Sequence, residues 1–375
     1  MIINKKPFVF AALASLSTAN AIADTVVEQG IVVTFQTADD DVSKDEIAGS
    51  YDLVVDTPIG KGGHLITYVE GASGLADDGV ANTFGEANGD AGSAYGYDSS
   101  GNQHGAFQVS ELFYQHDFGE SFITFGMMDA TAYGDGGEIA NDEGASFITT
   151  DLVNNPTIAF PNYTMAVAGH GQFNSIGINL FYGGAEGYDG NYTELVHFRS
   201  DTNGNDKGEF ILVEGTWSND STTVRLGYWI NNDYANGTFN GSTANNAENS
   251  GVYGLVEFTA GSFILNGRYG IADDTISEID SFVSVAGELG VGPGAFGLGY
   301  AYSTVSINLK RNPDQGDGRL LSSDYADRTS IELFYRYEAG SWTLTPAISS
   351  IDNSALYSAS TKSAVIYTLR GTYGF

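Results

Sequence analysis

The sequence predicts an all-β protein, a transmembrane antiparallel β-barrel of about sixteen strands with a long loop folded into its lumen. Three observations predict this class: the composition, segments of alternating polarity along the chain, and a last strand that ends on an aromatic ring. The 375 residues include 49 glycines, 22 tyrosines and 22 phenylalanines, and there is no cysteine. Glycine and aromatic residues favour tight turns and strands over long helices.

The N-terminus predicts export from the cytoplasm. Lys5 and Lys6 precede the apolar run FVFAALASL, and AIA at 21–23 offers the small residues of a cleavage site, with ANA ending at Ala21 as the alternative. The run is too short for a membrane span, which takes about 20 apolar residues. We therefore predict a cleaved signal peptide, residues 1–23. The mature chain is then periplasmic, secreted or a membrane β-barrel.

The net charge and the absence of certain motifs exclude several classes of protein function. The net charge is −32, with 47 acidic residues against 15 lysines and arginines, so phosphates are repelled and a nucleic-acid partner is not expected. We interpret the acidity as solvated loops. The lack of cysteine disfavours a disulfide scaffold and thiolate metal sites. No paired histidines or nucleophile motif occur, so we predict no enzyme, no cofactor and no metal.

Alternating segments recur from end to end. Residues 176–182, 224–230, 263–269, 296–302 and 331–337 each place apolar or aromatic residues at every second position, with mostly polar or small residues between them. Such alternation is typical of transmembrane β-strands. Bacterial single-chain barrels have even strand numbers, so we predict sixteen strands and a single barrel domain over residues 24–375. A barrel of this size keeps a water-filled lumen. The alternative is a soluble β-sandwich, which at this length would split into domains.

The chain ends in AVIYTLRGTYGF, residues 364–375, with an apolar row that runs to Tyr373 and Phe375. A last strand of this kind is expected to close the barrel, so that no edge is left unpaired in lipid, and to place its rings at the membrane interface. The terminal Phe375 also resembles the signal by which outer-membrane proteins are recognised for assembly. We therefore predict an outer-membrane location in a Gram-negative bacterium, with lipids and the barrel-assembly machinery as partners.

Four arginines share the polar rows of four different strands: Arg225, Arg268, Arg336 and Arg370. A lipid-facing arginine costs about 2–4 kcal/mol near the membrane midplane, so the lumen is the expected place for them. There a guanidinium presents a planar fork of donors to solute oxygens. In a second interpretation, each arginine only pairs with a neighbouring acid such as Glu332.

Residues 127–163 break the alternation and include two prolines. A loop of this length usually has a function or is disordered. We predict that it folds into the lumen opposite the arginines, narrows the pore and creates a transverse field across an aqueous gap. The alternative is an extracellular loop that covers the mouth, and a short helix is expected near 144–153. Its acidic residues, the candidate constriction residues, are Asp129, Asp135, Glu138, Asp142, Glu143 and Asp151.

Three blocks carry a resemblance to a known family: FGMMDATAYGDGGEIANDEGASFITTDLVNNPTIAFPN (125–162), IELFYRYEAGSWTLTPAIS (331–349) and YTLRGTYGF (367–375). Through them the chain resembles the carbohydrate-selective porins of the OprB type, which are outer-membrane β-barrel porins. The third block is shared by many outer-membrane barrels. The sequence departs from the family in its acidity and its short N-terminal region.

The resemblance implies a sixteen-stranded barrel, often trimeric, that passes small hydrophilic solutes such as monosaccharides by diffusion. A general or ion-biased diffusion porin is the alternative function. Arg336, Glu332 and Arg370 lie in matching blocks, and Asp129 begins the matching loop. The complete set of residues predicted to line the pore and contact the solute is Arg225, Trp229, Arg268, Glu332, Arg336, Arg370 and Asp129.

Overall fold

The computed structural model describes residues 25–74, 76, 78–90, 95–97, 103–141, 144–188, 208–235, 247–311, 326–354 and 363–375. The predicted signal peptide, 1–23, and the predicted constriction residues Asp142 and Glu143 lie outside these residues.

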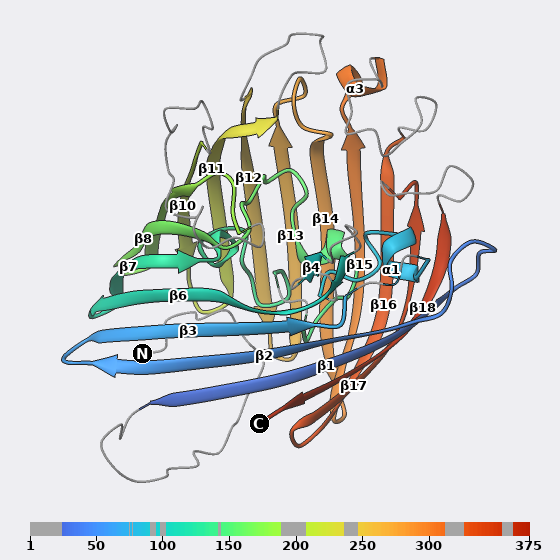
Figure 1. The fold of residues 1–375 in the computed structure, drawn as a ribbon, viewed down its shortest axis with the longest axis horizontal. Helices are drawn as coiled ribbons and strands as arrows, with labels where there is room; N and C mark the ends of the chain where they lie inside the picture. The colour runs from blue at the N-terminus through green and yellow to red at the C-terminus, as the bar shows by residue number, and fades with distance from the viewer. Residues whose placement is uncertain are drawn as a thin grey trace.

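Sixteen of the described strands close into one antiparallel barrel, as predicted (Figure 1). Each strand pairs with its neighbours in chain order, and the first strand, β1, pairs with the last, β18, where Gly30 lies opposite Gly374. The strands are β1 (Val26–Ala38), β2 (Glu46–Ile59), β3 (Gly63–Ala72), β6 (Phe107–Phe118), β7 (Ser121–Met128), β8 (Thr164–Phe173), β9 (Ile176–Gly184), β10 (Glu209–Ser218), β11 (Thr222–Ala235), β12 (Ala247–Ala260), β13 (Phe263–Ala272), β14 (Ile279–Val291), β15 (Gly294–Val305), β16 (Arg328–Ala339), β17 (Trp342–Asp352) and β18 (Ala364–Gly374). Two short strands, β4 (Tyr95–Tyr97) and β5 (Gln103–Gly105), form a separate sheet.

The side chains of each strand alternate between the two faces of the barrel wall. On β16, Ile331 and Leu333 are 43% and 46% exposed, whereas Glu332 and Phe334 are each 1% exposed. Apolar rows therefore lie on the outside and polar rows point inward, which is the reverse of a soluble protein and the arrangement that lipid requires. In the segment 331–337 the row at odd positions lies outside and Glu332, Phe334 and Arg336 lie on the inward row, as the alternation of a transmembrane strand requires.

The two ends of the barrel differ in their connections. Short turns join strands at one end, and several have a glycine in the left-handed region, such as Gly261 (φ 63) and Gly340 (φ 67). The long connections, including those after β3, β7 and β15, lie at the other end. The chain terminus lies at the short-turn end, where Phe375 and Gln29 exchange main-chain hydrogen bonds of 3.0 and 3.1 Å. The predicted closing role of the last strand is confirmed.

The helices in the described part of the chain are few and short: α1 (Val80–Thr83), η1 (Ala130–Tyr133), α2 (Thr150–Val153) and α3 (Ile307–Arg311). Helix α2 falls within the region where a short helix was predicted. Among the described residues no helix is long and apolar enough to cross a membrane.

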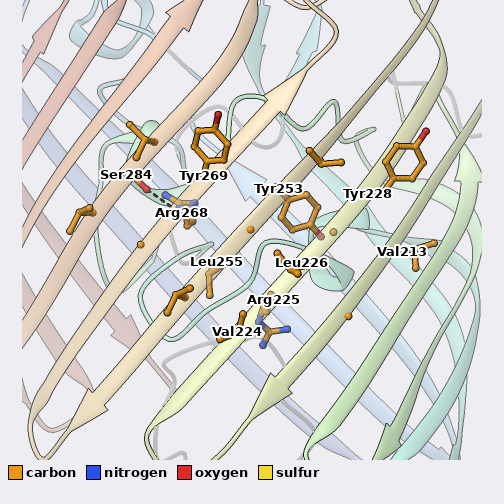
Figure 2. A pocket seen from close by; sticks show the side chains of 18 residues that line it. Val213, Val224, Arg225, Leu226, Tyr228, Tyr253, Leu255, Arg268, Tyr269 and Ser284 are labelled. Atoms are coloured by element: carbon orange, nitrogen blue, oxygen red, sulfur yellow. Dashed lines mark hydrogen bonds between the residues drawn. The ribbon is translucent and has the colours of Figure 1, made fainter.

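Figure 2 shows a stretch of β10 to β14 from close by. The outer surface of these strands has a shallow hollow between apolar side chains such as Leu226 and Tyr228, because Gly215, Gly254 and Gly267 carry no side chain there. The hollow lies on the outer apolar face. On these strands, the polar side chains that could bind a solute lie on the opposite, inward rows.

Candidate functional site

The connection between β7 and β8, residues 129–163, is the longest described insertion next to the inward rows, and we call it the loop segment. It begins with Asp129, whose carboxylate accepts a hydrogen bond from the Thr131 N–H at 2.8 Å and so caps η1. Side chains such as this satisfy the N–H groups that a helix start leaves without partners. The following residues run along the inward rows of β10 to β18, where wall side chains bind their main chain.

Arg268 binds the end of α2. Its guanidinium donates to the carbonyls of Asp151 (3.1 Å), Leu152 (2.7 Å) and Val153 (2.9 Å), and pairs with the Asp135 carboxylate at 3.1 Å. The last carbonyls of a helix have no partners within it and carry partial negative charge. Arg268 therefore fixes the position of α2, and its side chain is only 1% exposed.

Glu332 and Arg370 bind the residues just before α2. Glu332 accepts hydrogen bonds from the N–H groups of Ile148 (3.0 Å) and Thr149 (2.7 Å). Arg370 donates to the carbonyls of Ser146 (2.6 Å) and Phe147 (3.4 Å). The wall thus satisfies both the donors and the acceptors of an irregular stretch of backbone, which would otherwise be buried at a cost.

Three further wall glutamates, which the sequence analysis missed, also bind the loop segment, two of them through main-chain N–H groups and one through a side-chain hydroxyl. Glu214 accepts from the Asp135 N–H at 2.9 Å, and Glu257 accepts from the Glu138 N–H at 2.9 Å. Glu288 accepts from the Ser146 hydroxyl at 2.7 Å. Each lies on the polar row of a strand, so the alternation used for the arginines would also have found them.

Cations on the wall complete these contacts. Arg225 pairs with Glu214 at 2.9 Å, and Arg336 pairs with Glu288 at 3.0 Å while donating to the Ala145 carbonyl at 3.0 Å. Arg328, also missed from the sequence, forms a fork with both oxygens of Asp151 (2.9 and 2.7 Å) and pairs with Glu86 at 2.8 Å. Bidentate pairs of this kind fix orientation as well as position.

Apolar packing supports the charged contacts. Phe147 and Leu152 of the loop segment pack in one cluster with Phe334, whose ring lies 5.0 Å from that of Phe147. A second cluster contains Tyr133 of the segment and Trp229 of β11. The residues Tyr133 and Trp229 are 7% and 0% exposed, so this cluster is covered.

One carboxyl group in the segment has an unusual environment. Burial raises the pKa of the Asp135 carboxyl to about 6, although the neighbouring Arg268 opposes this and Glu214 adds to it. Desolvation disfavours a charged carboxylate, and an adjacent cation only partly compensates.

The structure places all six predicted strand residues of the site on inward rows. Glu332, Arg268, Arg370 and Trp229 are at most 3% exposed, while the side chains of Arg225 and Arg336 keep 15% and 14% exposure. In the loop segment Asp135 and Asp151 are buried, Asp129 is half-buried and Glu138 is exposed. Contact of any of these residues with a solute stays a prediction.

The predicted aqueous gap between the arginines and the acidic loop is wrong. Arg268 touches Asp135, and Arg336 and Arg370 bind main-chain carbonyls of the segment directly. The physical reason is that irregular backbone away from water needs partners, and the inward arginines and glutamates supply them. The sequence did not predict that the main chain of the loop segment would need the inward arginines and glutamates as hydrogen-bond partners.

The closed sixteen-stranded barrel, with an apolar outside and a polar inside, defines an outer-membrane β-barrel of the porin type. No family model and no curated protein matches the chain. Solved structures do: OprB of Pseudomonas putida superposes with a TM-score of 0.67 at 13% identity, over 94% of each chain. OmpT of Vibrio cholerae gives 0.56 at 15% identity, covering 94% of this chain and 99% of that one. A mutant of Rh. blastica porin gives 0.52 at 11% identity, over 94% and 100%.

At these identities the likeness concerns the fold. The chain has the fold of the outer-membrane porins, and the predicted resemblance to OprB-type porins is confirmed at that level.

Proposed function

We propose that this chain is an outer-membrane porin through which small hydrophilic solutes pass by diffusion. One observation carries the proposal: a closed barrel of sixteen strands, apolar outside, whose inward rows bind a long internal segment by its main chain. Barrels of this size have room for an aqueous passage. The porin fold of the similar structures supports the same function.

We further propose that the loop segment lies within the lumen and narrows the passage. Its partners support this: Arg268, Glu332 and Arg370 all belong to inward rows, and each binds the main chain of the segment. A loop that only covered the mouth would not reach side chains in the middle of three strands. With such anchoring the constriction is permanent rather than a gate.

Carbohydrates are the solute class that we propose first. The walls offer carboxylate, amide and guanidinium groups that can exchange hydrogen bonds with sugar hydroxyls, and pore width and such contacts decide selectivity. The second candidate is an ion-biased diffusion porin without sugar preference. One observation favours it: the residues Trp229, Phe181 and Phe210 are at most 2% exposed. Their rings therefore offer no face on which a sugar could stack.

The remaining parts of the proposal follow from a porin function. The apolar rows contact outer-membrane lipids, Phe375 serves recognition by the barrel-assembly machinery, and the chain forms a homotrimer. One of the similar structures is described as a trimer form of OmpT, which supports the last point by analogy. No catalysis and no cofactor are proposed.

Two measurements test the function. Fractionation and detergent gels ask whether the chain partitions with outer membranes and migrates faster before boiling than after it. Reconstitution into planar bilayers tests whether the protein gives stepwise conductance. Addition of a neutral sugar then tests whether the current is blocked in a concentration-dependent way. A folded barrel in the membrane that conducts no ions would exclude the porin function. Conductance without block by any sugar would leave the ion-biased alternative.

A further inference from the structure

The barrel wall is divided into two halves of different charge. Eight contiguous strands, β1–β3 and β6–β10, contain no lysine or arginine. All arginines on the described strands belong to the other half, on β11, β13, β16 and β18. The field inside the lumen therefore depends on how the charges of each half are compensated.

In the arginine-bearing half the positive charges are matched locally. Arg225 pairs with Glu214, Arg268 with Asp135, Arg328 with Asp151 and Glu86, and Arg336 with Glu288. Arg370 lies 1% exposed against carbonyls of the loop segment. Since opposite charges a few ångströms apart cancel at longer range, this half offers little net positive charge to a passing ion.

The other half keeps partly exposed carboxylates on its inward rows. We call Glu28 of β1, Asp52 and Asp56 of β2, and Glu111 and Asp117 of β6 the carboxylate wall; all five are half-buried. Their facing follows from the strand pairing. Glu111 lies directly opposite the inward Tyr68, whose hydroxyl donates to Asp52 at 2.6 Å. Glu28 shares its row with the buried Val32 and Thr34.

One carboxylate of the loop segment, Asp129, lies beside this wall. The Tyr163 hydroxyl lies near Glu70, Asp129 and Glu111, and its pKa is raised, first by burial and then by these carboxylates. A basic group, His64, lies between Asp56 (2.9 Å) and Asp117 (3.6 Å) of the wall. Asp129 and the wall thus present the same sign of charge.

We propose that the passage prefers cations to anions and that the carboxylate wall sets this preference, so that neutral and cationic solutes pass while anionic ones are disfavoured. The inference rests on the proposed porin function and specifies its solute class. Rows of carboxylates on a pore wall raise the local concentration of cations. Among the described residues no group of acids or histidines is arranged to hold a metal ion, so the wall acts as a diffuse charge and not as a chelating site.

Reversal potentials in a potassium chloride gradient test the proposal, with the complete barrel in planar bilayers. We expect a severalfold permeability ratio of K⁺ over Cl⁻ at low salt, falling towards one in about 1 M salt, where screening reaches about 3 Å. The variant Asp52→Asn with Glu111→Gln should lower the ratio by about half, since it removes two charges of the wall. Asparagine and glutamine keep an acceptor oxygen for partners such as Tyr68.

A matched control removes two carboxylates from outside the lumen. Glu209 accepts from the outward Tyr182 hydroxyl at 2.7 Å, and Asp352 is exposed at the end of β17. Glu209→Gln with Asp352→Asn should leave the ratio unchanged. A conducting wild type with a ratio of one or below overturns the proposal, although the porin function stands. So does a selective wild type whose ratio is the same in the wall variant. Absence of conductance in a correctly folded barrel overturns the porin function itself.

Discussion

Arg370 on β18 and Glu332 on β16 hold neighbouring peptide groups of the same loop: Arg370 binds the carbonyls of Ser146 and Phe147, and Glu332 binds the N–H groups of Ile148 and Thr149. The two side chains have opposite charge and act on opposite ends of the backbone dipole. Together they hold residues 146–149 against the wall. The first predictions concern this arrangement.

The variant Glu332→Ala should loosen the loop segment. It leaves the N–H groups of Ile148 and Thr149 buried without their acceptor, at a cost of about 1–3 kcal/mol for each group. We expect larger and noisier single-channel conductance with an intact barrel. The control is Leu333→Ala on the same strand, which shortens a lipid-facing side chain. If both variants conduct like the wild type, Glu332 does not position the constriction.

The double variant Arg336→Ala with Arg370→Ala removes two cations and three carbonyl contacts from the segment. We expect a wider passage, a shift of ion selectivity towards cations and a weaker block of current by sugar. Bilayer recordings measure all three. The barrel should still assemble, because the outward rows and Phe375 are unchanged. Unchanged selectivity and unchanged sugar block would mean that solute discrimination lies elsewhere on the wall.

The fold could be predicted from the sequence because lipid imposes a simple rule on each strand. An alternating segment such as 331–337 must place Leu333 outside and Glu332 inside, whatever the rest of the chain does. The same rule placed Arg268 and Arg370 correctly. It would also have placed Glu214, Glu257 and Glu288, had carboxylates been treated like arginines.

The role of the inward residues could not be predicted in the same way. Alternation shows which face Arg268 occupies, but not that the carbonyls of Asp151, Leu152 and Val153 lie within its reach. That contact depends on how an irregular segment with little periodicity folds in three dimensions. The burial of Trp229 likewise depends on Tyr133 and other residues distant in sequence.

A third prediction concerns pH. The pKa of Asp135 is about 6 in the folded protein, above the ordinary value of about 3.9. The folded state therefore binds more protons between these values. The contribution of this group to stability is fully present below about pH 4 and is lost as the pH rises through about 6, by an amount of the order of 3 kcal/mol. We expect the protection of residues 131–141 from hydrogen exchange, corrected for intrinsic rates, to fall over this range.

The charged groups that face Asp135 are Arg268 and Glu214, with Arg225 and Tyr253 bound to Glu214, and the Asn155 side chain hydrogen-bonds the Asp135 carboxyl. Asp135→Asn keeps the shape of the side chain and removes its titration, so the decline in protection should flatten. A decline of the same size in this variant would assign the pH dependence to Glu214 or another group.

Which face of the barrel wall a strand residue occupies can be tested directly, because the chain has no cysteine and each introduced thiol is unique. A water-soluble thiol reagent should label Asp52→Cys and Glu111→Cys in membranes, since both positions are inward and half-buried. Leu333→Cys should resist it, since the position faces lipid. Glu332→Cys should also react slowly, because the loop segment covers the site, which is 1% exposed. Rapid labelling at 333 together with protection at 52 and 111 would reverse the assignment of the two faces.

The last prediction separates two roles of the C-terminal residue. The main chain of Phe375 exchanges two hydrogen bonds with Gln29 and so joins the last strand to the first. Its ring lies 5.3 Å from Tyr373, which in turn lies 4.5 Å from Trp342, within a band of rings at one edge of the barrel. Phe375→Ala removes the ring and keeps the two hydrogen bonds, whereas deletion of residue 375 removes both.

If the ring serves recognition by the assembly machinery, Phe375→Ala should refold in detergent like the wild type but reach the outer membrane of cells in reduced amount. The deletion should be impaired in both assays, because closure of β1 on β18 also loses two backbone hydrogen bonds, each worth about 1 kcal/mol. Heat-modifiable mobility reports folding, and immunoblots of membrane fractions report assembly. Equal refolding defects in the two variants would show that the ring acts through interface packing, and normal cellular assembly of Phe375→Ala would remove the recognition role.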